Sequence, residues 1–107
     1  MEFFVRTEIR LPPDMEEGQR KALIIAELDR GRELLMSKKM KRVWRPPGTW
    51  KAVALYDVDS PQELHTLIRS LPLWPWMTVE VESVFAHPLE VVSSEQASSA
   101  ELAENWP

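Results

Sequence analysis

The chain has 107 residues, of which 44% are hydrophobic and 28% charged, a composition typical of one globular domain. Its formal net charge of −4 argues against nucleic acid as the main partner, and the absence of cysteine excludes disulfides and thiolate chemistry. No apolar run approaches the ~20 residues of a membrane span, and Met1 does not begin a signal-peptide pattern. We therefore expect no membrane partner and a cytoplasmic location.

Two hydrophobic periodicities predict six elements in the first part of the chain. Alternation of apolar and polar residues predicts four strands, over residues 2–10, 41–45, 50–58 and 78–86. Helical spacing predicts a long helix from the N-cap Asp14 to about Ser37, and a short one that begins at the capping box Ser60-Pro61-Gln62-Glu63. The order βαββαβ predicts a ferredoxin-like α+β fold, a four-stranded antiparallel sheet with two helices on one face.

The other face of the predicted sheet has no helix to cover it. We expect side chains such as Phe4, Tyr56 and Val84 on this face. A sheet face without helices goes either to water or to a partner. We therefore expect two copies to pair sheet to sheet, in an obligate homo-oligomer.

The pattern changes near residue 89. Residues 1–88 form the predicted domain, and residues 89–107, which are rich in Ser, Glu and Ala, form a polar tail or arm. The tail can form a short helix across a neighbouring copy and ends near Trp106, but disorder is the simpler expectation.

Glu27 is the most informative residue of the sequence. It shares the spacing of an apolar stripe on the long helix, formed by Leu23, Ile24, Leu28, Gly31, Leu34 and Leu35. Desolvating an unpaired carboxylate costs several kcal/mol or raises its pKa, and Gly31 leaves space beside it. A carboxylate of raised pKa beside a gap suits proton transfer without a cofactor. Equally, Glu27 can lie at the edge of the stripe and either extend its carboxylate to solvent or pair with Arg30 or with an arginine of a strand.

Other polar and aromatic residues give weaker signals. Trp44, Arg45 and Trp50 surround one predicted hairpin, where two rings and a guanidinium can hold a small organic acid. Equally, Trp44 can belong to the core while Arg45 pairs with an acid of a neighbouring strand. His65 and His87 are far apart and have no third ligand at a recognisable spacing, so we expect no metal site.

Two further segments have a structural interpretation. The rigid apolar loop over residues 73–77 (LWPWM) is typical of an oligomer contact more than of a ligand site. The basic run over residues 38–42 (KKMKR) fits a solvated helix end better than a nucleic-acid site, because the whole chain is acidic.

Several of these segments together resemble the muconolactone Δ-isomerase family. They are Leu11-Pro12-Pro13-Asp14-Met15, Glu27, Val43-Trp44-Arg45 with Gly48, Tyr56-Asp57-Val58, Leu64-His65, Leu71-Pro72-Leu73-Trp74-Pro75-Trp76-Met77, Glu80-Val81 and His87-Pro88. The resemblance covers about residues 1–88, and the loop over residues 71–77 is its most specific part.

The resemblance implies a cofactor-free enzyme with a ferredoxin-like fold and a homo-oligomer, commonly a decamer built from dimers. Members of the family convert muconolactone to 3-oxoadipate enol-lactone in the β-ketoadipate route of aromatic degradation. It implies that Glu27 takes the proton from the γ carbon of the lactone and returns one at the α carbon. It also implies Arg45 as the partner of the carboxymethyl group, Trp44 and Trp50 as walls, and His65 as a polar contact.

The sequence departs from the family pattern in the segment from Trp50 to Ala54. Trp50, Ala52 and Ala54 stand where the family commonly has Tyr and small polar residues, so the pocket offers fewer hydrogen bonds. A chlorinated or methylated lactone would suit such a pocket. Two alternatives therefore stay open: an enzyme like the related 5-chloromuconolactone dehalogenase, and a non-catalytic oligomeric module that binds a small acid.

Overall fold

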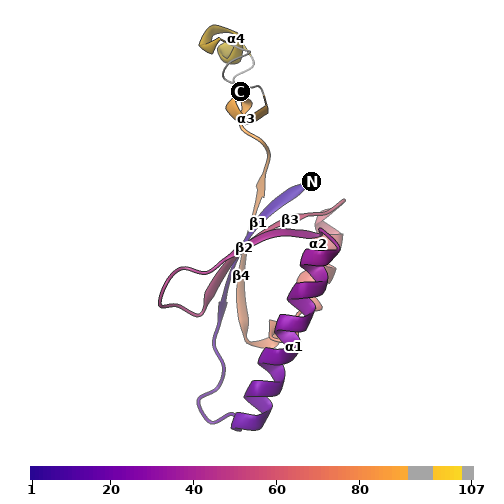
Figure 1. The fold of residues 1–107 in the computed structure, drawn as a ribbon, viewed down its shortest axis with the longest axis vertical. Coiled ribbons are helices and arrows are strands. Elements are labelled where there is room, and N and C mark those ends of the chain that lie inside the picture. The colour runs from indigo at the N-terminus through magenta and orange to yellow at the C-terminus, as the bar shows by residue number, and fades with distance from the viewer. Residues whose placement is uncertain (92–97, 105–107) are drawn as a thin grey trace.

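The computed structural model describes residues 1–91 and 98–104, and its main body is a sheet with two helices on one side (Figure 1). The elements are β1 (Glu2–Ile9), α1 (Glu17–Met36), β2 (Met40–Trp44), β3 (Lys51–Asp57), α2 (Pro61–Arg69), the 3₁₀ turn Trp74–Trp76, β4 (Met77–Val84), α3 (Pro88–Val91) and α4 (Ser99–Glu104). The strands lie in the order β2-β3-β1-β4 and every pairing is antiparallel. The predicted βαββαβ fold class is therefore confirmed.

The strand register shows which residues share a face. Phe3 pairs with Tyr56 and Ser83, whereas Phe4 pairs with Leu55 and Glu82. Directly opposed residues lie on the same face of a sheet. Phe3 and Tyr56 therefore face the helices, and the prediction that Tyr56 lies on the open face with Phe4 is wrong.

The core lies between the sheet and the helices. Its buried residues are Phe3, Val5, Leu34, Met40, Ala54, Tyr56, Val58, Leu64, Ile68 and Leu71. α2 contributes as predicted, because its N-cap Ser60 accepts from the backbone N–H of Glu63 at 3.1 Å and its apolar residues point inward.

The long helix differs from its prediction in two ways. Its N-cap is Glu16, which accepts from the backbone N–H groups of Gly18 and Gln19, so the prediction of Asp14 is wrong. The apolar stripe is also only partly buried, since Leu28 is 62% exposed and Leu35 is 40% exposed. A cavity between α1 and the sheet separates these side chains from the strands, as described below.

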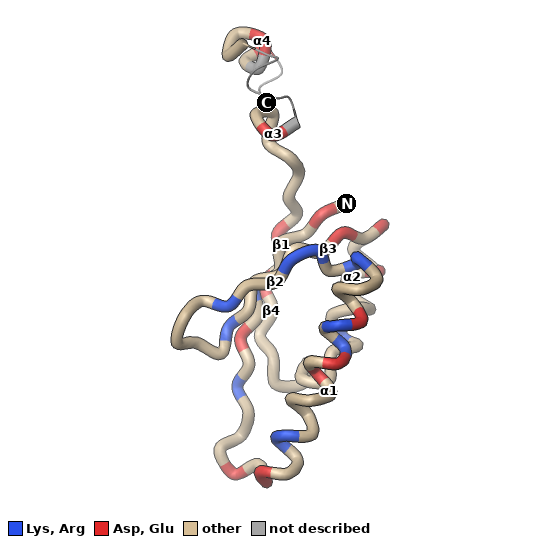
Figure 2. The backbone as a smooth tube through the Cα atoms, in the orientation of Figure 1, with Lys and Arg blue, Asp and Glu red and all other residues tan. Residues whose placement is uncertain are grey.

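Basic and acidic residues are spread along the elements of the main body, and both signs occur along α1 (Figure 2). Two lysines of the basic run after α1 contact acids: Lys39 contacts Glu63 at 2.7 Å, and Lys41 contacts Glu2 at 3.4 Å. These pairs fit the predicted solvated helix end. No helix of the described residues is long and apolar enough to cross a membrane.

The C-terminal segment leaves the main body after β4 (Figure 1). Its described parts contain the short helices α3 and α4. Trp106, the expected end of the tail, lies outside the described residues. The division into a domain over residues 1–88 and a tail over residues 89–107 stays a prediction.

Candidate active site

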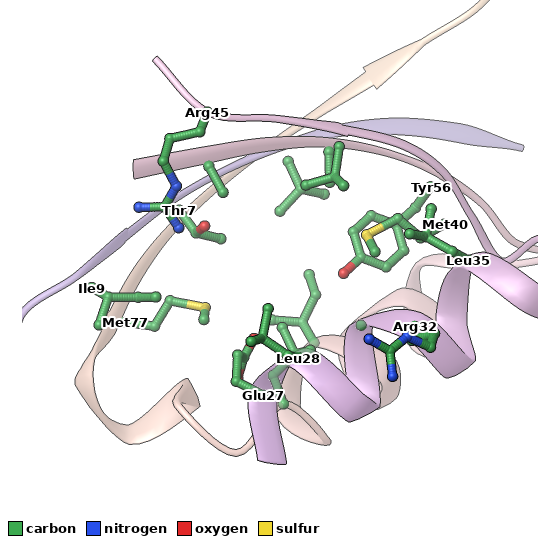
Figure 3. A pocket seen from close by; sticks show the side chains of 17 residues that line it. Thr7, Ile9, Glu27, Leu28, Arg32, Leu35, Met40, Arg45, Tyr56 and Met77 are labelled. Carbon is green, nitrogen blue, oxygen red and sulfur yellow. The ribbon is translucent and has the colours of Figure 1, made fainter. Parts of the chain in front are cut away.

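A half-open cavity of about 360 Å³ lies between α1 and the helix-covered face of the sheet (Figure 3). Its lining is mostly apolar and comes from both layers: Val5, Thr7, Ile9, Glu27, Leu28, Gly31, Arg32, Leu35, Met40, Val43, Arg45, Ala52, Ala54, Tyr56, Ile68, Leu71 and Met77. The volume is in the range of small-molecule sites, which are typically about 300–1,000 Å³. The cavity exists because β3 presents only the methyl groups of Ala52 and Ala54 there and α1 has no side chain at Gly31.

Glu27 lies in the wall of this cavity that α1 forms. One carboxylate oxygen accepts a hydrogen bond from the backbone N–H of Leu73 at 2.9 Å. Burial raises the pKa of Glu27 above the ordinary value of 4.5, and the Leu73 N–H offsets part of that rise. Glu27 is therefore a carboxylate whose neutral and charged forms are closer in free energy than those of a surface acid.

The loop that holds Glu27 follows α2. Trp74 N–H donates to the Leu71 carbonyl at 2.9 Å and Trp76 N–H to the Leu73 carbonyl at 3.0 Å, which leaves the Leu73 N–H for the carboxylate. Sequence analysis predicted this loop as an oligomer contact and missed its bond to Glu27. The sequence feature that could have indicated this bond is the pair of prolines, Pro72 and Pro75, because they restrict the backbone around Leu73.

The arginine expected as a structural partner of Glu27 is engaged elsewhere. Arg30 donates to Ser70 Oγ at 2.9 Å and to Glu33 at 2.8 Å. Within the described ranges, no Lys or Arg forms an ion pair with Glu27. The interpretation of Glu27 as a member of a surface ion pair is therefore wrong, and the carboxylate is available to a ligand.

Two guanidinium groups lie at opposite parts of the cavity, Arg45 on the side of the sheet and Arg32 on α1 (Figure 3). Arg45 donates one hydrogen bond to the Thr49 carbonyl at 3.0 Å, and Asp57, an acid of the neighbouring strand, contacts Lys41 and the N-terminal amine instead. Arg45 thus keeps donors that an anionic group of a ligand could use, and its role as a ligand-binding residue stays a prediction.

The comparisons with known proteins agree with this geometry. The family model described as muconolactone delta-isomerase matches residues 1–90. This chain belongs to the muconolactone delta-isomerase family. The resemblance predicted from the sequence is therefore confirmed.

Individual members of the family align over most of their length. Muconolactone Delta-isomerase of Acinetobacter baylyi is 35% identical over 85% of this chain and 95% of its own, and that of Rhodococcus opacus is 33% identical over 83% and 96%. A crystal structure of muconolactone isomerase superposes with a TM-score of 0.81 at 30% identity, over 87% of this chain and 97% of the other. A dehydrochlorinase from Burkholderia phenoliruptrix, at 16% identity and a TM-score of 0.62, shares the fold.

The family resemblance predicted five residues for the pocket, and three of them do not line the cavity of this family member. Trp44 stacks near Phe4 on the open face, with ring centroids 6.0 Å apart. Trp50 is 47% exposed and lies under the guanidinium of Arg20, and His65 is exposed on α2. The cavity as described therefore keeps Glu27 and Arg45 from the predicted set.

The cavity also contains a residue that sequence analysis placed on the wrong face. Tyr56 is 3% exposed, and its hydroxyl points into the cavity from the wall opposite α1 (Figure 3). The spacing Ala52, Ala54, Tyr56 could have indicated it, because small residues on one face of a strand leave room for a ligand. Among the described residues, no three His, Asp or Glu side chains come together as a metal site.

Proposed function

We propose that this protein is a cofactor-independent isomerase that converts muconolactone to 3-oxoadipate enol-lactone. Membership of the muconolactone delta-isomerase family supports this activity. The single observation that carries it is a half-buried carboxylate, Glu27, without an ion-pair partner among the described residues and facing an apolar cavity of small-molecule size. The reaction places the protein in the degradation of aromatic compounds by the β-ketoadipate route.

The reaction needs one group that can both accept and donate a proton. Glu27 takes the proton from the γ carbon of the lactone, and the electrons of that C–H bond spread through the ring to the carbonyl oxygen as a dienolate. Glu27 then returns a proton at the α carbon. A raised pKa suits both steps, because the optimum for general acid–base catalysis lies near the working pH.

Arg45 supports the second part of the proposal. The substrate carries a carboxymethyl group, and Arg45 is a cation at the opposite part of the cavity from Arg32 (Figure 3). A guanidinium can bind a carboxylate through two parallel hydrogen bonds. We assign Arg45 to the carboxymethyl group, which would leave the lactone ring between it and Glu27.

The test is turnover of muconolactone by the protein and by Glu27→Gln, followed by absorbance. Glu27→Gln keeps the shape and can still accept from Leu73, but it cannot take a proton, so we expect kcat/KM to fall by about 10²-fold or more. Glu33→Gln is the matched control, because Glu33 lies on the same helix, is exposed and pairs with Arg30. Wild-type rates in Glu27→Gln, or no turnover by the unaltered protein, would contradict the proposal.

Assembly and location stay predictions. The proposal includes a homo-oligomer that pairs through the open sheet face, and a cytoplasmic location.

A further inference from the structure

The proposed reaction requires a group that the family resemblance did not supply. When Glu27 takes the γ proton, its own charge is neutralised and negative charge develops on the carbonyl oxygen of the lactone. In a cavity with a mostly apolar lining, that oxygen needs a hydrogen-bond donor placed in advance. The side-chain donors of the cavity are Thr7, Arg32, Arg45 and Tyr56.

Tyr56 is the donor that the fold holds most firmly. Its ring is 3% exposed and belongs to the core cluster, and β3 is an interior strand paired with both β1 and β2. Its cross-strand neighbours, Phe3 and Met40, are buried as well. The position of the hydroxyl is thus set by packing before any ligand binds.

The Tyr56 hydroxyl opens into the cavity and has no protein partner in the described ranges. No hydrogen bond among the described residues involves the Tyr56 hydroxyl. Every fully buried side-chain oxygen or nitrogen of the described residues, however, has a hydrogen-bond partner. Both observations hold only if the hydroxyl reaches the cavity space. Figure 3 shows it directed away from the sheet, toward the wall of α1 that carries Glu27 and Leu28.

The electrostatics of the site agree with a donor. Burial first, and the nearby Glu27 carboxylate second, raise the pKa of Tyr56 to about 12, although Arg30 acts in the opposite direction. The hydroxyl therefore keeps its proton at neutral pH. A neutral hydroxyl of this kind can donate a hydrogen bond to an oxygen that gains negative charge.

The two arginines suit another task. The Arg32 side chain is 71% exposed and contacts Asp29 at 3.7 Å, so water and an acid already weaken its field. Arg45 is exposed and donates to the Thr49 carbonyl. These groups fit a solvated carboxylate better than an oxygen deep in the cavity.

We propose that the Tyr56 hydroxyl donates a hydrogen bond to the lactone carbonyl oxygen and stabilises the dienolate. This inference rests on the proposed function. The γ C–H bond breaks as the Glu27 O–H bond forms, the electron pair moves through the ring to the carbonyl oxygen, and Tyr56 retains its proton throughout. Return of the proton from Glu27 to the α carbon restores the carbonyl group and ends the charge on its oxygen.

The first arm of the test is kinetic. Tyr56→Phe removes only the hydroxyl, and because that hydroxyl has no protein partner among the described residues we expect an unchanged melting temperature. We expect kcat on muconolactone to fall by about 10²-fold with KM changed far less, since a donor to the developing charge acts mainly in the transition state. Thr66→Val removes an exposed hydroxyl on α2 and is the matched control with wild-type kinetics. An unchanged kcat in Tyr56→Phe would overturn the inference.

The second arm needs no turnover and separates the two proposals. 3-Hydroxyphenylacetate has a planar ring with a carboxymethyl group, and its hydroxyl oxygen stands in for the carbonyl oxygen of the lactone. 3-Methylphenylacetate has a methyl group in place of that hydroxyl. By titration calorimetry we expect Tyr56→Phe to weaken the hydroxyl probe about tenfold and to leave the methyl probe unaffected. If the protein shows this result but does not turn over muconolactone, Tyr56 remains the group that binds the oxygen. Only the proposal that muconolactone is the substrate is then rejected. Equal effects on both probes, or no binding of the hydroxyl probe, would overturn the inference.

Discussion

Alternate residues of β3 face two different surroundings. Ala52, Ala54 and Tyr56 face the helices and line the cavity, whereas Val53 and Leu55 lie on the open face beside residues such as Phe4. The larger aliphatic side chains of the strand are thus on the side without helices. This comparison teaches that a sheet face can be covered by helices without being filled, and that small residues on it mark a ligand site.

The open face has its own organisation. The rings of Phe4 and Trp44 lie next to each other, and the guanidiniums of Arg6 and Arg42 lie over them, each 5.0 Å from a ring centroid. Arg6 also contacts Glu82 at 2.8 Å. The open face therefore carries aromatic and charged groups suited to the predicted interface, and the covered face carries the proposed active site.

The largest expected effect concerns the open face. Leu55→Arg would place a charge in the predicted sheet-to-sheet interface, where both copies would bury it without a partner, and we expect the dimer to dissociate completely. Sedimentation velocity measures the mass. Thr66→Arg adds the same charge on the exposed side of α2 and should leave the assembly intact. If the unaltered protein sediments as a single 12.4 kDa chain, the prediction of a dimer is wrong.

The next effect concerns the space on the covered face. Ala52→Leu adds three carbons to the cavity wall, and we expect kcat/KM on muconolactone to fall by about 10²-fold as the lactone loses its place. Val53→Leu makes a smaller enlargement one residue away on the open face and should cost much less. Circular dichroism checks that both variants fold. Equal losses in the two variants would remove the distinction between the faces.

A smaller effect should distinguish Arg45 from Arg42. Arg45 lines the cavity, whereas Arg42 lies on the open face. Arg45→Ala removes the proposed partner of the carboxymethyl group, so we expect KM to rise by about tenfold or more, with a smaller change in kcat. Arg42→Ala removes a cation of the open face, over Trp44, and serves as the control. If KM does not change in Arg45→Ala, Arg32 becomes the candidate for the carboxylate.

The smallest effect is on stability. The pKa of Glu27 is raised in the folded protein, so ionising Glu27 costs stability as pH rises through that pKa, and below the unfolded value of about 4.5 the cost is absent. Glu27→Gln should therefore be slightly more stable than the unaltered protein at neutral pH. We expect its free energy of unfolding to be higher by less than about 1 kcal/mol, because the group is half exposed. This gain should vanish at low pH. Thermal melts across this pH range measure it. A loss of stability at neutral pH would show that the ionised carboxylate is favoured by its surroundings.

The sequence determined the order and type of the elements, and it singled out Glu27 as the proposed base. Period-two and helical spacing, with Ser60 and the prolines as end signals, are local properties, so the strands and helices could be located from neighbouring residues alone. Glu27 could be found because a carboxylate within an apolar stripe is a local contradiction that burial alone would not tolerate. The family resemblance rested on the same local segments.

The tertiary structure alone decided which side chains meet. Sequence analysis assigned Tyr56 to the open face with Phe4, and only the pairing of Phe3 with Tyr56 corrects this. Trp44 and Arg45 are adjacent in sequence, yet the cavity takes only Arg45. Cross-strand register and the separation of α1 from the sheet depend on contacts between distant residues, which no local pattern encodes, and these contacts place Tyr56 opposite the helix that carries Glu27.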